Sequence, residues 1–258
     1  MTTSQFFSGA WTWSPMVIAL SAIAVAAYVA AFRLNRRIGW LLIALGTVWL
    51  TLLSPLNALA DGYLFSAHMV QHILLLLVVP ALALFSLPRS QSLLAGPRWL
   101  RRPLLGWFAG VGAMWFWHAP AMCNAAVSSR PVHAVQTVSL LLLGGLFWRQ
   151  ILAPWETERL APPAAVLYLF SACIACSVLG IIITFSPVTV CSIYAGQSLD
   201  PLGLLATIRQ GWGFSASRDQ QIGGLLMWVP MCLIYLAAIL AQIARWFAMA
   251  SAPTRRAI

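Results

Sequence analysis

The chain has 258 residues, of which 61% are hydrophobic and only 8% are charged, and its mean hydropathy is +0.86. About a quarter of the residues in a soluble domain are charged, so this composition excludes a water-soluble fold. The net charge of +10 comes from arginine, because the chain has no lysine. No basic helix or aromatic-interleaved patch accompanies it, which indicates loops beside anionic lipid rather than a nucleic-acid surface.

Apolar runs of roughly 20 residues, enough to cross ~30 Å of hydrocarbon, divide the sequence. They predict an all-α membrane bundle of about seven transmembrane helices in a single domain, 1–258. In chain order the expected spans are 15–32, 38–58, 64–87, 103–122, 132–152, 163–186 and 222–247. The runs are apolar on every side, as expected of helices that face both lipid and one another.

The arginines are distributed unevenly between the two ends of these spans. Twelve fall on one side: Arg33, Arg36, Arg37, Arg89, Arg98, Arg101, Arg102, Arg149, Arg159, Arg245, Arg255 and Arg256. Only Arg130, Arg209 and Arg218 fall on the other. Because cytoplasmic loops carry the excess of positive charge, this asymmetry predicts an outer N-terminus and a cytoplasmic C-terminus.

All four histidines are predicted to lie near the outer face of the membrane. His68 and His72 occupy the outer part of the third span, His118 lies near the outer end of the outward-running fourth span, and His133 lies at the start of the fifth. One alternative is that each histidine forms an interhelical hydrogen bond. Ionisable groups within a membrane are costly, however, and usually serve a function.

The spacing and chemistry of these residues favour a metal site. His68 and His72 are one helical turn apart, about 6 Å in rise, so both imidazoles can face one ion. Imidazole suits copper and zinc, and the sulfur atoms of Met69, Met122 and Cys123 would favour Cu(I). Met69 also stands where a zinc protease would carry its glutamate base, so we expect no hydrolytic enzyme. The predicted metal ligands are His68, His72, His118 and His133.

Other polar residues give weaker signals. Cys173 and Cys176 are expected to pack between helices, and the five cysteines are too few and too scattered to predict a disulfide framework. Asp61 and Asp219 stand at the outer ends of the third and seventh spans. Each carboxylate is predicted either to orient a histidine or to cap a helix.

Several motifs together resemble the CtaG family of cytochrome c oxidase assembly factors, the seven-helix type linked to caa-type oxidases. They are Ser54-Pro55-Leu56, the segment 65–72, Trp117-His118-x-Pro120, His133, Phe147-Trp148 and the segment 219–230, and the likeness extends over about 54–235. The resemblance implies a protein of the bacterial plasma membrane that helps to build the copper-containing core of the oxidase. Its partners would be oxidase subunits or other assembly factors.

Two features depart from the family pattern. Met231 stands where the family typically has glycine, and the outer loop 187–218 is longer than expected and carries Cys191. Neither feature removes a histidine, so the predicted site is unaffected.

Two other classes of function remain open at the level of sequence. A b-type haem could be ligated by two histidines on facing helices. Helical bis-histidine sites usually show two separated pairs, however, whereas this chain has one cluster. A transporter of a metal or small solute would need polar groups along its path, and the inner half of the spans carries no charge. We therefore favour a copper-binding assembly factor.

Overall fold

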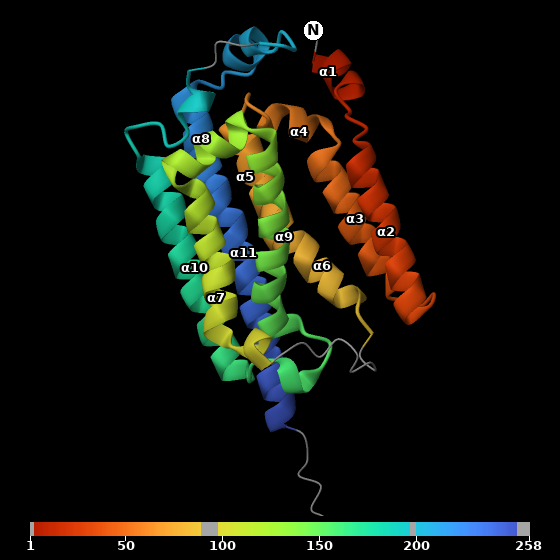
Figure 1. Ribbon diagram of the computed structural model, residues 1–258. Coiled ribbons are helices and arrows are strands. Elements are labelled where there is room, and N and C mark those ends of the chain that lie inside the picture. Colours follow the sequence, from red (N-terminus) through yellow and green to blue (C-terminus); the bar gives the residue numbers. More distant parts are fainter. Residues whose placement is uncertain (1–2, 89–97, 197–199, 252–258) are drawn as a thin grey trace, which may run out of the picture.

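The computed structural model describes residues 3–88, 98–196 and 200–251, and within these ranges the chain is helical, without strands (Figure 1). Five helical stretches are long and apolar enough to cross a membrane. They are α2 (Pro15–Phe32), Phe65–Ser86, α9 (Arg130–Leu152), α10 (Pro162–Phe185) and α11 (Ala216–Ala250). These stretches correspond to five of the seven predicted spans. Arg89, Arg255 and Arg256 lie outside the described residues.

The two remaining predicted spans, 38–58 and 103–122, are shorter than expected. Helix α3 (Ile38–Leu52) has 15 residues and α7 (Pro103–His118) has 16. At ~1.5 Å per residue, 16 residues span about 24 Å, short of ~30 Å of hydrocarbon. The number of seven spans and the orientation of the termini therefore stay predictions.

Proline explains why both predictions were too long. Pro55 begins α4 (Pro55–Ala60), where the Ser54 hydroxyl accepts a hydrogen bond from the backbone N–H of Leu56. Pro120 begins α8 (Pro120–Ser128) after Ala119. A proline disfavours helical geometry at the residue before it and suits the first turn of a new helix.

The third predicted span contains an irregular turn. It consists of α5 (Phe65–Ile73), the π-helical turn η1 (Leu74–Val78) and α6 (Val79–Ser86). Pro80 is the second residue after this turn and cannot donate a backbone hydrogen bond, which is a recognised cause of such irregularities. Gly144 of α9 packs against the carbonyl group of Leu76 in this turn, so the two backbones lie in close contact.

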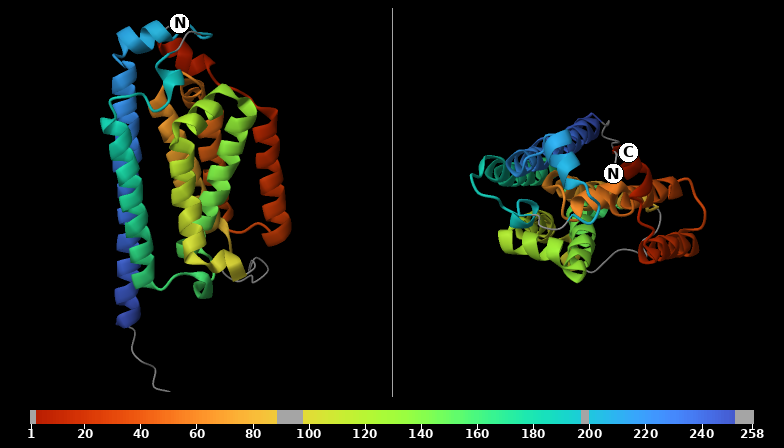
Figure 2. Two further views of the ribbon diagram at one scale, coloured as in Figure 1. Left: turned by 60° about the vertical axis from the view of Figure 1, so that its left-hand side comes forward. Right: turned by 90° about the horizontal axis from the view of Figure 1, so that it is seen from above.

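The helices α10 and α11 form an antiparallel pair on one side of the molecule, and α2 lies on the opposite side (Figure 2). Glycine permits the close pairing, because a Cβ atom on Gly180 would lie 2.8 Å from Cβ of Trp228. Helix α2 is mostly exposed, as expected of a lipid-facing helix. It is held by two hydrogen bonds, from Trp49 Nε1 to Ser21 Oγ and from Tyr28 Oη to the Ser86 carbonyl.

The bundle has two chemically different ends. The arginine end, defined by Arg37, Arg101, Arg149 and Arg245, holds the loop after α2, η3 (Arg98–Arg101) and the C-terminal ends of α9 and α11. At this end, the buried Glu158 carboxylate forms ion pairs with Arg149 and Arg101, with N···O distances of 2.5 and 3.0 Å.

The opposite, histidine end carries α1 (Thr3–Gly9), α4, α8, and a long loop with the short helices η5 (Ser192–Tyr194) and η6 (Thr207–Gly211) (Figure 1). In the described part of the chain, Arg130, Arg209 and Arg218 lie at this histidine end, as predicted.

A disulfide, which was not predicted from the sequence, joins Cys123 of α8 to Cys191 of this loop. The two residues are 68 positions apart, and their spacing matches no motif that would predict the pair. Because Pro120 starts a separate helix at the end of the bundle, Cys123 lies beside the loop rather than within a span. Asn124 adds to this attachment by accepting a hydrogen bond from the backbone N–H of Ile193.

Candidate metal centre

Three of the four predicted histidine ligands gather in one buried cluster at the histidine end. His68 and His72 lie on α5, and His118 is the last residue of α7. Their exposed fractions are 1%, 1% and 3%. His133, in the first turn of α9, lies at the rim, with its ring centroid 6.3 Å from that of His68.

The imidazole nitrogens of this histidine cluster lie close together. The Nε2 atoms of His68 and His72 are 3.0 Å apart, and the ring centroids of His72 and His118 are 4.8 Å apart. The Nε2 atom of His118 lies 3.0 Å from the sulfur of Met69. Its Nδ1 atom lies 2.6 Å from the carbonyl oxygen of Met114, which requires the proton on Nδ1 and leaves the Nε2 lone pair free.

The cluster fits a soft metal ion in its donor chemistry. Two ligands placed ~2.0–2.1 Å from a tetrahedral ion are about 3.3 Å apart, close to the separation of the His68 and His72 nitrogens. In addition, His72 Nδ1 and Gln136 Nε2 are buried without hydrogen-bond partners, and Gln136 lies beside His72. Imidazole nitrogens next to a thioether bind Cu(I) more favourably than they bind a hard cation.

The structure does not assemble a complete set of ligands. Over 3–88, 98–196 and 200–251, no group of three or more His, Cys, Asp or Glu side chains has the arrangement of a metal site. His118 is turned toward Met69, and His133 stays at the rim. Of the weaker candidates, Cys123 is taken up by its disulfide and Met122 is only partly buried on α8.

Asp219 fixes the start of the helix that carries two of the histidines. Its carboxylate accepts hydrogen bonds from the backbone N–H groups of Phe65 and Ser66, at 2.7 and 3.0 Å. The carboxylate therefore caps α5 from α11, and α11 itself is capped by Ser215. Of the two predicted roles of Asp219, the structure selects capping, on a helix other than its own. Asp61 is exposed at the end of α4, near His133.

The residues after Asp219 connect further elements to the start of α5. The Gln220 side chain accepts from the Val190 N–H at 2.8 Å and donates to carbonyl groups of the segment 183–188. Gly223 lets α5 approach, because a Cβ atom there would lie 2.5 Å from the Phe65 ring and 3.2 Å from Met69 Cγ. The segment 219–224 therefore joins α5, α10, α11 and the long loop.

Three residues that surround the cluster were not predicted from the sequence. Gln71 donates to the Thr51 carbonyl and the Asn57 side chain, and this ties α5 to α3 and α4. Gln136 is described above. The ring centroid of Tyr194 lies 6.1 Å from that of His68, and its hydroxyl donates to the Ala60 carbonyl. The two glutamines could have been found, since polar groups within apolar spans are usually functional.

The fold and the site together define a multi-pass helical membrane protein with a buried histidine cluster near one end. The family model of the cytochrome c oxidase caa3 assembly factor (Caa3_CtaG) matches residues 17–249, and the chain belongs to this family. The resemblance read from the motifs is thereby confirmed. No curated protein and no solved structure matches the chain.

Proposed function

We propose that this assembly factor holds copper at the histidine cluster and supplies it to, or stabilises, a subunit of the oxidase. His68, His72 and His118 would bind the ion together with Met69, and His133 would act at the rim. The cluster would face outward across a bacterial plasma membrane, with the C-terminus in the cytoplasm, as the arginine distribution predicts.

The observation that supports copper most directly is the close approach of two buried imidazole nitrogens, with no other polar group between the two atoms. The Nε2 atoms of His68 and His72 are 3.0 Å apart inside a buried core. Without an ion, one Nε2 atom must carry a proton and donate it to the lone pair of the other. With both protons on Nδ1 instead, the two Nε2 lone pairs face the same point. A copper ion would engage both lone pairs, and Met69 lies within 3.0 Å of the next imidazole to contribute a thioether.

The same separation argues against a haem held by His68 and His72. Axial ligands of a haem approach its iron from opposite faces of the ring. Two nitrogens 3.0 Å apart on one helix leave no space for the macrocycle between them. An optical spectrum checks this directly, because a haem protein would show a Soret band.

Metal analysis tests the site. We expect protein purified with copper to retain it in the wild type and in Met122→Leu, a control in which a methionine outside the cluster is replaced conservatively. His68→Ala combined with His72→Ala should lose the copper bound at the histidine cluster and so retain less than the wild type, and His133→Ala should lose less. Equal copper in the wild type and the double variant would refute the histidine site.

Loss of the gene tests the role in assembly. Deletion should lower oxidase activity while oxidase transcripts stay normal, because an assembly factor acts after synthesis of its partner. His72→Ala should reproduce the defect with the variant still present in the membrane. A deletion strain that forms fully active, copper-replete oxidase under copper limitation would contradict the proposed function.

A further inference from the structure

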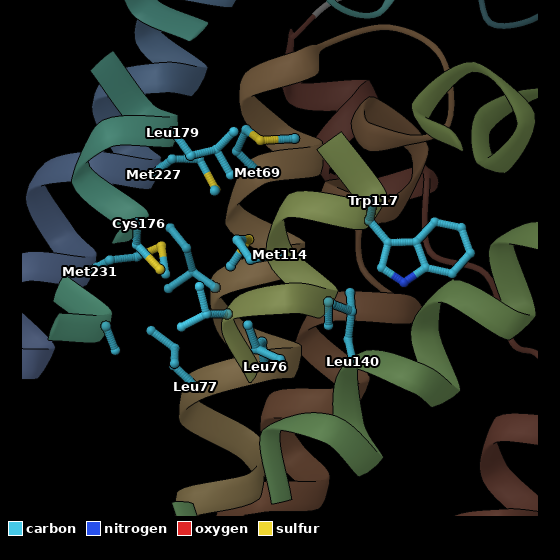
Figure 3. Close-up of a cluster of buried hydrophobic side chains, with 14 of the residues drawn as sticks. Met69, Leu76, Leu77, Met114, Trp117, Leu140, Cys176, Leu179, Met227 and Met231 are labelled. Atoms are coloured by element: carbon cyan, nitrogen blue, oxygen red, sulfur yellow. The ribbon is translucent and has the colours of Figure 1, made fainter. Parts of the chain in front are cut away.

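Sulfur atoms gather in the core just below the histidine cluster. The residues concerned are Met69 on α5, Met114 on α7, Cys176 on α10, and Met227 and Met231 on α11. All five belong to one buried core, and none is more than 2% exposed. In Figure 3, Met69 and Met227 lie at one level, and Cys176, Met231 and Met114 lie below them. Four helices therefore contribute sulfur to one region.

The register of α10 and α11 brings Cys176 opposite Met231. Gly180 packs on Trp228, and further along the pair the Sγ atoms of Cys173 and Cys232 are 3.2 Å apart. In an antiparallel pair with this register, Cys176 and Met231 occupy nearly the same level. Figure 3 shows the two side chains pointing toward one another.

Met69 connects this region to the histidine cluster. Its sulfur lies 3.0 Å from His118 Nε2, and its Cγ atom packs at Gly223 of α11. Met227 and Met231 follow Gly223 at intervals of four residues, so all three share one face of α11. Potential ligands thus continue from the imidazoles through Met69 to Met227, Cys176 and Met231.

We propose that Cys176, Met227 and Met231 form a second, sulfur-only site for Cu(I) beside the histidine cluster and reached through Met69. The proposal rests on the proposed function for the identity of the ion.

Charge balance favours one thiol and two thioethers at this depth. Binding of Cu⁺ releases the Cys176 proton to water and forms one Cu–S(thiolate) bond, with no change in oxidation state. Because thioethers are neutral, the charge of the site is the same before and after binding, and this avoids the cost of a net charge in the membrane interior. The Tyr235 hydroxyl, 3.8 Å from Cys176 Sγ, is placed to donate to the thiolate.

Cys173 and Cys232 provide a matched control. They lie on the same two helices, one turn from the site, but are only partly buried and have each other and Ser177 as hydrogen-bond partners. Two thiolates with one Cu⁺ would leave a net negative charge in the membrane. We therefore assign the metal to Cys176 and not to this pair.

Anaerobic titration of the full chain in lipid nanodiscs with Cu(I), in competition with a chromophoric chelator, tests the proposal. The wild type should bind two equivalents, and His68→Ala with His72→Ala should keep one. In that histidine variant, X-ray absorption should show only sulfur neighbours around copper. Met231→Leu, a conservative change in packing, should weaken the remaining site at least about tenfold, the lower bound for disturbing even an outer partner of a metal ligand.

The remaining variants separate the possible failures. Cys176→Ser should abolish the sulfur site, whereas Cys173→Ser and Met122→Leu should leave both equivalents bound. If the histidine variant binds no copper, the sulfur site is refuted and the histidine site stands. If one equivalent is bound, unaffected by the histidine variant and lost in Cys176→Ser, the histidine site is refuted and the sulfur site stands. Unchanged affinity in Met231→Leu with an unchanged unfolding temperature would also overturn the proposal.

Discussion

Replacing Gly144 by alanine should push α9 away from the π-helical turn that follows the histidines. A Cβ atom at this position would lie 3.0 Å from both the carbonyl carbon of Leu76 and Cγ of Pro80, and closer still to the Leu76 oxygen. Ordinary contacts begin at 3.4 Å, so the two segments must separate by at least 0.4 Å. The neighbour is backbone and a rigid proline ring, neither of which can rotate out of the way.

The size of the effect of Gly144→Ala follows from the methyl group that it adds, and the neighbouring Gly145 supplies the control. An added methylene in a packed core costs about 1–3 kcal/mol. At roughly 2–4 °C per kcal/mol for a chain of this size, Gly144→Ala should lower the unfolding temperature by about 2–12 °C. A Cβ atom on Gly145 meets nothing within 4 Å, and alanine is favoured over glycine in a helix by about 1 kcal/mol.

Thermal unfolding in nanodiscs, followed by tryptophan fluorescence, measures both variants. Gly145→Ala should unfold at or above the temperature of the wild type. If both variants unfold at the same temperature, the close contact between α9 and the π-helical turn is not present in the protein.

Three further predictions concern the ends of the bundle. Asp219→Ala leaves two backbone N–H groups of α5 unsatisfied. At about 1–3 kcal/mol for each group, the protein should be destabilised by about 2–6 kcal/mol. As a control, Asp61→Ala replaces an exposed carboxylate and should change the unfolding temperature little. In a non-reducing digest of the wild type, the peptides that contain Cys123 and Cys191 should be found linked, and Cys191→Ser should abolish this linked peptide. The substitution should also lower stability by about 2–4 kcal/mol. A linked peptide in the variant, or none in the wild type, would contradict the disulfide. A reporter fused to the C-terminus should be active only in the cytoplasm and one at the N-terminus only outside, and a periplasmic C-terminus would overturn the orientation.

The parts of the fold that could be predicted from sequence are those fixed by local patterns. The span 15–32 coincides with α2, and the ends of α9 and α10 lie within two residues of the prediction. The prediction failed where proline acted on a continuing apolar run, at Pro55 and at Pro120. Hydropathy averages over such residues, although the steric rule for proline could have placed both breaks.

The candidate site shows the same division. His68 and His72 could be paired from their spacing, because a helix fixes residues four apart. His118 could be placed at the right depth, but its turn toward Met69 depends on the Met114 carbonyl and on packing between helices. The capping of α5 by Asp219 joins residues more than 150 positions apart. No local pattern carries that information.

The disulfide at the histidine end has a consequence for the compartment in which this part of the chain matures. Disulfide bonds form and persist in oxidising surroundings, whereas cytosolic thiols are kept reduced. The bond between Cys123 and Cys191 therefore predicts that the histidine end lies outside the cytoplasm, by redox chemistry alone and without counting charges. A cell that cannot oxidise thiols in its envelope should therefore leave the long loop without this covalent link to α8.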